Sequence, residues 1–255
     1  MWPPGRDLRA AVMTVLLPAP LAAQGAFFEG GLLFARGDYV YVTPTNSASL
    51  SAGLGLTAGR LTLRATLPVF ARDTRVLVPK GSVPTAPAPA ATPSSYTAAL
   101  SDPFAQASID VLPAGRTALG LTASVKVPVV AAGAFGTGRW DYGGGVSVSR
   151  MLGSSALVGV DLGYWHLGDP PDLRLNDVAT GTLTLGRSFA RSWSASVSFS
   201  ASRAAVPGYA DPRWLGVLVG RASGRGMWGL TLSAGLTPTA PDVGVGLIWR
   251  VRLGG

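Results

Sequence analysis

The chain has 255 residues, of which 47% are hydrophobic and only 13% are charged, about half the charged share of an ordinary soluble domain. The 21 Lys and Arg residues outnumber the 13 Asp and Glu residues, yet they are scattered singly, without the basic run or helix of a nucleic-acid binder. The absence of cysteine excludes a disulfide framework, a thiolate metal site and a thiol nucleophile. The 34 glycines disfavour long helices.

Residues 1–23 have the features of a secretory signal peptide. Arg6 and Arg9 give a positive start, Ala10–Leu17 gives a short apolar core, and two prolines end it. This apolar run is too short for a membrane-spanning helix, and no other stretch reaches the roughly 18 apolar residues that such a helix needs. We therefore expect an exported chain.

Segments of period-two alternation follow one another along the rest of the chain. In Ser192–Ala205, for example, Trp193, Val197 and Phe199 alternate with an unbroken row of serines. Most segments run for about a dozen residues, which is longer than an ordinary soluble strand and close to what a tilted strand needs to cross a bilayer. The predicted strands are Ala26–Val42, Ala48–Thr57, Arg60–Ala71, Phe104–Leu112, Arg116–Val129, Asp141–Leu152, Ser154–Leu167, Val178–Phe189, Ser192–Ala205, Pro212–Ser223, Gly226–Thr237 and Asp242–Leu253.

If one pair of strands crosses a membrane, all of them must, because an open sheet edge leaves backbone groups unsatisfied in hydrocarbon. The sequence therefore predicts an all-β fold over residues 24–255, a transmembrane antiparallel up-and-down β-barrel of about 12 strands. Ten or fourteen strands are alternatives, since the first segment is irregular. A secreted all-β sandwich is the other architecture, but strands this long with one uncharged face disfavour it.

The connections between these segments alternate in length. Those near residues 58–59, 113–115, 153, 190–191 and 224–225 are tight, whereas 72–103, 130–140, 168–177 and 206–211 are longer. The longest, 72–103, is rich in Pro and Ala and is predicted to be an outer loop. Outer-membrane barrels have short periplasmic turns and long outer loops. We therefore predict residence in the bacterial outer membrane.

Aromatic residues gather at both ends of the predicted strands, as they do at the two interfaces of a membrane. Trp193, Trp228 and Trp249 fall at the predicted periplasmic end, and Tyr142, Tyr164 and Trp214 fall at the outer end. Soluble sandwiches have no reason to form such girdles.

The inward phase of the predicted strands carries rows of Ser and Thr and a few ionisable side chains. These are Arg60, Arg64, Asp110, Lys126, Asp161, Arg250 and Arg252. Any one of them has a purely structural alternative, in which a paired or hydrated charge holds the wall in register. Together they form a polar lining of mixed sign, and such linings set pore selectivity. We expect the solute path to pass Arg64, Asp110, Lys126, Asp161 and Arg250, with Trp165 as a resting place for aromatic solutes at the mouth.

His166 is the only histidine of the chain, and it raises the alternative of an outer-membrane lipid hydrolase. However, His166 falls on the lipid-facing phase of its strand beside an aromatic girdle, and no Gly-x-Ser-x-Gly elbow is present. The glycines of residues 133–138 have no helix N-terminus to hold phosphate, and no spacing of His, Asp or Glu suggests a metal site. We expect neither enzyme activity nor a cofactor.

Several loop and strand-start motifs carry a family resemblance. They are Lys126-Val127-Pro128, Gly136-Thr137-Gly138-Arg139-Trp140-Asp141-Tyr142-Gly143, Gly163-Tyr164 and Gly168-Asp169-Pro170-Pro171. With these motifs the chain resembles a transporter-like outer-membrane family associated with the meta-cleavage pathway of phenol degradation, in a layout that extends over Phe104–Leu253. The resemblance implies uptake of aromatic or other hydrophobic small molecules. It also makes Gly136, Thr137, Gly138, Trp140, Asp141 and Tyr142 the outer-loop family motif.

Two features depart from the family pattern. Val129-Val130 follow Pro128 where the family commonly has a Thr-Gly turn, and the chain ends in Val251–Gly255 instead of a terminal aromatic residue. The expected partners are outer-membrane lipid, a small hydrophobic or aromatic solute and the barrel-assembly machinery, but not nucleic acid. We expect a passive channel for such solutes, with two alternatives: the hydrolase, and an occluded structural barrel with partner-binding loops.

Overall fold

The computed structural model describes residues 25–37, 45–73, 96–112, 115–131, 136–170, 173–189 and 192–254, so the predicted signal peptide lies outside the described residues. Every regular element among the described residues is a β-strand, and none forms a helix long and apolar enough to cross a membrane. The strands are β1 (Gly25–Gly37), β2 (Thr45–Ala58), β3 (Leu61–Asp73), β4 (Tyr96–Leu100), β5 (Phe104–Asp110), β6 (Thr117–Lys126), β7 (Asp141–Leu152), β8 (Ala156–His166), β9 (Val178–Ser188), β10 (Trp193–Ser202), β11 (Arg213–Ser223), β12 (Gly226–Gly235) and β13 (Val243–Leu253).

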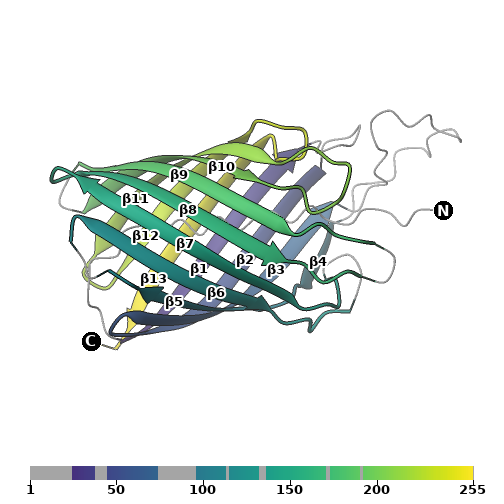
Figure 1. Cartoon of the computed structure of the whole chain (residues 1–255), viewed down its shortest axis with the longest axis horizontal. Coiled ribbons are helices and arrows are strands. Elements are labelled where there is room, and N and C mark those ends of the chain that lie inside the picture. The colour runs from purple at the N-terminus through teal and green to yellow at the C-terminus, as the bar shows by residue number, and fades with distance from the viewer. Residues whose placement is uncertain are drawn as a thin grey trace, which may run out of the picture.

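The strands form one closed antiparallel barrel (Figure 1). Apart from β4 and β5, strands that follow each other in sequence are neighbours, and β1 pairs with both β2 and β13. The seam between β1 and β13 is paired from Ala26 opposite Leu253 to Arg36 opposite Val243. Because the first and last strands are hydrogen-bonded along their length, the ring has no free edge at the seam. The predicted up-and-down barrel is confirmed.

One position of the ring is shared by two strands. β3 pairs with β5 through Leu61–Thr66 and with β4 through Val69–Asp73, and residues 101–103 interrupt the strand between β4 and β5. Because β4 and β5 together take one position in the ring, the thirteen strands form a twelve-stranded barrel. The predicted loop 72–103 is therefore shorter at both ends, because β3 reaches Asp73 and residues 96–100 form β4. A five-residue strand is too short to show alternation among Pro, Ala, Ser and Thr.

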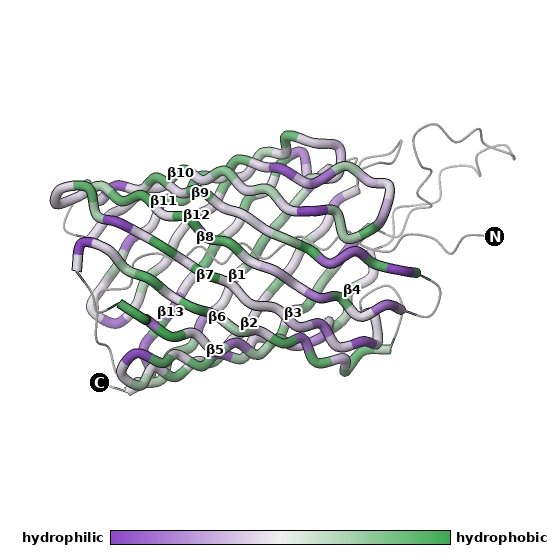
Figure 2. Tube along the Cα trace, viewed as in Figure 1, coloured by the Kyte–Doolittle hydropathy of each residue, from purple (hydrophilic) through white to green (hydrophobic). Residues whose placement is uncertain are grey.

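Alternation separates the two faces of the wall as the sequence predicts. Large apolar side chains on the outer face are exposed, with Leu54 and Leu162 each 59% and Leu185 57% exposed. An apolar outer face of this extent requires a lipid surrounding. In Figure 2, hydrophobic residues alternate along the strands, and hydrophilic residues gather towards the ends of the barrel.

The connections alternate between two ends of the barrel. Residues 59–60, 153–155 and 224–225 make tight turns at one end, whereas the connections that follow β6, β8 and β10 leave from the opposite end. In the turn after β7, Gly153 has a φ of 71°, a left-handed conformation that favours glycine. We call these the tight-turn end and the loop end.

A row of large side chains crosses four strands on the outer face at the tight-turn end. Register places Trp193 opposite Arg221, Arg221 opposite Trp228, and Trp228 opposite Trp249. The Arg221 guanidinium lies 5.6 Å from the Trp193 ring centroid, and the Trp193 and Trp228 rings meet edge to face at 5.5 Å. This is the expected interfacial girdle. At the loop end Trp214 differs from expectation, because it pairs with the buried, inward-facing Ser200 and shares the inner face.

Candidate functional site

The inner face is built largely from small side chains. Around β7–β10 the inward phase is a continuous field of Gly, Ser and Thr, in which Ser147 is opposite Asp161, Asp161 is opposite Thr182, and Thr184 is opposite Ser198. Small side chains leave room inside a barrel of twelve strands and offer hydroxyl groups to water or solute. Within the described residues, charged side chains gather into clusters on this face at two places.

The first place, at the loop end, is the Lys126 cluster of Asp102, Lys126, Thr137 and Asp141. Lys126 Nζ lies 2.7 Å from Asp141 Oδ2 and 3.5 Å from Asp102 Oδ2, and it donates a 2.5 Å hydrogen bond to Thr137 Oγ1. The side chains of Lys126 and Asp102 are fully buried, and that of Asp141 is 3% exposed. Lys126 faces inward as expected, but it presents no charge to the lumen.

The Lys126 cluster joins the segments that carry the family motifs. Asp102 Oδ1 accepts the Val130 amide, and Asp141 Oδ1 accepts the Gly168 amide. Arg139 adds a hydrogen bond from Nε to the Asp169 carbonyl, at 3.0 Å. Motifs that are far apart in sequence thus meet at one buried ionic centre, which fixes the strand break, two outer loops and the start of β7.

The rest of the family motif lies around this centre. A Cβ on Gly136 would come within 2.8 Å of the Val130 backbone oxygen, so only glycine allows this close approach. Trp140 and Tyr142 stack with their rings 6.3 Å apart and 8° from parallel. Both are exposed and lie towards the lipid. The motif therefore has an ionic part inside the wall and an aromatic part outside.

An aromatic pair lies on the inner face next to the Lys126 cluster. Trp165 meets Phe104 edge to face at 6.1 Å, and Phe104 is opposite Lys126 in register. Trp165 covers Gly143, where any Cβ would overlap the indole ring. Trp165, predicted as a resting place for aromatic solutes, thus has an aromatic neighbour that the sequence did not single out.

The second place, towards the tight-turn end, is the Glu29 cluster of Phe27, Glu29, Arg64 and Arg250. Arg64 Nε lies 2.9 Å from Glu29 Oε1, and Arg250 Nη2 donates a 3.0 Å hydrogen bond to Glu29 Oε2. The side chains of Arg64, Glu29 and Arg250 are 15%, 17% and 32% exposed. Unlike Lys126, these charges remain in contact with the lumen.

The Phe27 ring packs against both guanidinium groups. The centre of the Arg250 guanidinium lies 4.5 Å from the ring centroid and that of Arg64 lies 5.9 Å away, both within cation–π range. Phe27 is only 6% exposed and lies over Gly55, where a Cβ would overlap the ring. A glycine on β2 therefore makes the space for the aromatic base of the cluster.

The remaining predicted lumen charges are dispersed. Asp161 lies part-buried on β8 and has no ion-pair partner among the described residues. Asp110 and Arg252 are exposed at the tight-turn end, and Arg60 donates to the Val111 carbonyl there. Of the predicted lumen charges, the structure brings only Arg64 and Arg250 into one cluster.

His166 lies on the outer face at the loop end. His166 Nδ1 is 2.9 Å from Asp177 Oδ1, and Tyr164 Oη donates a 2.6 Å hydrogen bond to Asp177 Oδ2. The Tyr164 hydrogen bond is the main cause that holds the pKa of Asp177 below its ordinary value. In the described part of the chain no serine hydroxyl lies within hydrogen-bond distance of His166, and no three His, Asp or Glu side chains gather to hold a metal. A His-dependent hydrolase would need a serine nucleophile beside His166.

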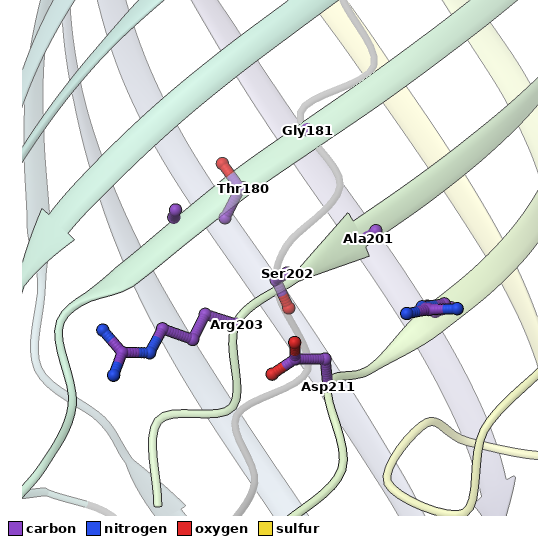
Figure 3. Close-up of a pocket in the computed structure, with 8 residues that line it drawn as sticks. Thr180, Gly181, Ala201, Ser202, Arg203 and Asp211 are labelled. Atoms are coloured by element: carbon purple, nitrogen blue, oxygen red, sulfur yellow. The ribbon is translucent and has the colours of Figure 1, made fainter.

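A shallow pocket of about 460 Å³ opens at the loop end between β9, β10 and β11. Figure 3 shows Thr180, Ser202 and Asp211 around it, with Arg203 extending away from Asp211. Asp211 Oδ1 accepts the Ala204 amide, so this carboxylate is engaged in holding the loop.

Sequence reasoning missed Phe27, Glu29, Asp102 and Phe104. Glu29 lies in the irregular first segment, where no alternation assigned it to a face. Asp102 lies in the strand break that was predicted as loop. One signal was present: a lone glutamate in an exported, arginine-rich barrel needs a basic partner if it faces inward.

Comparison with known proteins gives a likeness of fold. No protein-family model matches the chain, and no curated protein matches it. The COG4313 outer membrane channel from Pseudomonas putida F1 matches with a TM-score of 0.72 at 13% identity, over 92% of this chain and 97% of that one. The P. putida toluene transporter TodX matches at 0.53 and 10% identity, over 92% and 91%. The CymD monoaromatic hydrocarbon channel matches at 0.50 and 10% identity, over 92% and 90%.

These likenesses, together with the apolar outer face and the aromatic girdle, define the class. The chain is an outer-membrane β-barrel protein. None of the three similar structures is named for phenol degradation, so the meta-cleavage association stays a resemblance of sequence motifs.

Proposed function

We propose that the protein is an outer-membrane channel for the passive passage of small molecules, hydrophobic or aromatic ones among them. The observation that carries this proposal is the inner face, where a field of Gly, Ser and Thr is interrupted by one buried and one lumen-exposed ionic cluster. The partly exposed charges of the Glu29 cluster stay hydrated and can contact a solute in the lumen, which supports a polar path through the barrel.

Two further observations support the aromatic part of the proposal. Phe104 and Trp165 form an aromatic pair on the inner face at the loop end, where a solute from outside would enter. The similar structures include a toluene transporter and a monoaromatic hydrocarbon channel.

The test is permeability of liposomes that contain the purified, refolded protein. A small neutral aromatic solute is compared with a sugar of similar size, and protein-free liposomes give the background. Faster passage of the aromatic solute supports selective uptake, and equal passage of both indicates a general pore. If neither passes, the channel proposal fails and the occluded barrel becomes the better account.

The hydrolase alternative has its own test. If the protein is a channel, wild type and His166→Ala both show only background lipid turnover. Measurable lipid turnover in wild type that is lost in His166→Ala would favour the enzyme. Phe104→Ala and Trp165→Ala are the matching channel variants, and they are expected to slow aromatic passage more than sugar passage.

A further inference from the structure

The Glu29 cluster carries more positive charge than its single carboxylate neutralises. Two guanidinium groups, from Arg64 on β3 and Arg250 on β13, share the two oxygens of Glu29 on β1. Each guanidinium has five N–H donors in a rigid fork. Glu29 lies within 3.0 Å of one nitrogen of each, and only the Arg250 contact is a hydrogen bond, so most donors of this pair are left for water or for a ligand.

One donor of the pair is both buried and unsatisfied. Arg64 Nε lies 2.9 Å from Glu29 Oε1, yet its N–H is not directed at that oxygen, so the contact is an ion pair and not a hydrogen bond. The buried Nε–H has no hydrogen-bond partner among the described residues. Buried polar groups are ordinarily satisfied, and an exception in a native wall points to a missing partner.

The donors are also held in place before any ligand arrives. Phe27 supports both guanidinium groups from the wall side, and Gly55 gives the ring its space. Fixed donors lose little conformational entropy on binding, which favours recognition over a loose surface arginine. The planar fork of arginine fits the two oxygens of a carboxylate.

The opposite wall carries the opposite charge. Counting around the ring through β2, β3, β5, β6 and β7, β8 is the sixth of twelve strands from β1, and it bears Asp161. A negative group inside the lumen is therefore attracted to the wall of β1, β3 and β13 and repelled from that of β8.

From this arrangement we propose that the Glu29 cluster is a binding site in the lumen for the carboxylate group of small organic acids that pass through the barrel. Aromatic acids are the preferred class. The proposal deepens the channel function and rests on it. The solute carboxylate accepts hydrogen bonds from the free guanidinium nitrogens, and its uncharged body stays in the lumen beside the small side chains of the inner face.

The experiment is ion selectivity in planar bilayers with the full mature chain. Reversal potentials are recorded in a gradient of potassium chloride and again with potassium benzoate in place of chloride, for wild type, Arg64→Gln/Arg250→Gln and Arg221→Gln. Arg221→Gln is the control, since it removes one positive charge from the outer face instead of the lumen. Wild type is expected to prefer anions and benzoate in particular. A unit charge at about 4 Å in water changes the local ion concentration about fivefold, so the double variant loses at least that preference.

Each outcome decides something different. Absence of any channel opening in wild type defeats the channel function itself. Openings without anion preference, or a preference that the double variant keeps, overturn only the carboxylate site. A wild-type channel that prefers anions but passes benzoate no better than chloride also overturns the carboxylate-binding proposal. If the double variant does not fold, Glu29→Gln keeps both arginines and adds one net positive charge; an unchanged benzoate preference in that variant contradicts the proposal.

Discussion

Two ionic clusters inside one barrel have opposite composition and opposite exposure. The Lys126 cluster sets one cation between two carboxylates and is almost completely buried. The Glu29 cluster sets one carboxylate between two cations and leaves its charged side chains 15% to 32% exposed. Full burial of charge is costly and is offset only by complete pairing, so the first cluster specifies structure. Partial exposure keeps the second hydrated and free to exchange partners with a solute. An inward-facing charge is therefore not by itself part of a solute path.

The largest expected effect comes from removing the centre of the buried cluster. Lys126→Met leaves Asp102 and Asp141 buried without their shared cation, which is expected to lower the free energy of unfolding by about 3–5 kcal/mol. The measurement is the urea midpoint of the refolded barrel, followed by the mobility shift of the folded form on unheated gels.

Neutralising the whole cluster separates charge from shape. In Lys126→Met combined with Asp102→Asn and Asp141→Asn no unpaired charge stays buried, so we expect much of the lost stability to return. If this triple variant is as unstable as Lys126→Met alone, the cluster does not act through its charges.

The fold was predictable from the sequence because a strand that crosses a membrane alternates over its whole length. Twelve segments, the closed barrel and the alternation of tight turns and loops follow from that regularity. β4 was not predictable, since five residues among Pro, Ala, Ser and Thr show no usable period. Trp214 shows a second limit. Its predicted position near the loop end of the barrel is correct, but the position of a residue along its strand does not determine whether its side chain faces the lipid or the lumen.

The site was predictable only in part. Alternation correctly assigned Lys126, Arg64 and Arg250 to the inner face, but it gave no partners. Whether an inward charge is buried or open depends on contacts across strands and from loops, as with Asp102 from the strand break. Glu29 was missed because its segment lacks clear alternation, although its pairing with two arginines gives the Glu29 cluster its excess charge.

A smaller effect is expected at the base of the Glu29 cluster. Gly55→Ala forces the Phe27 ring from its place, since the new Cβ would overlap it. We expect a loss of about 1–3 kcal/mol and a weaker anion preference, because the guanidinium groups lose their support. Gly159→Ala is the control, as the nearest atoms to its Cβ would be 3.8 Å away, and it is expected to change neither quantity.

The smallest effect is expected at the exposed pair on the outer rim. Tyr164→Phe removes the hydrogen bond that most lowers the pKa of Asp177, so this pKa rises towards its ordinary value in an NMR titration. Because a depressed carboxyl pKa stabilises the fold above its ordinary pKa and loses that effect as the pH falls through the folded value, any change in unfolding belongs to the acid range. A shift of the urea midpoint at neutral pH as large as that of Gly55→Ala would contradict this assignment.

The division between a structural and a permeation cluster is tested most directly by one set of reversal potentials in a potassium chloride gradient. The compared proteins are wild type, Arg64→Gln/Arg250→Gln, and the neutralised triple variant of Asp102, Lys126 and Asp141. We expect the triple variant to keep the wild-type reversal potential and the arginine double variant to shift it towards cation preference. A reversal potential that shifts in the triple variant and stays unchanged in the arginine variant would show that the Lys126 cluster, and not the Glu29 cluster, acts on permeating ions.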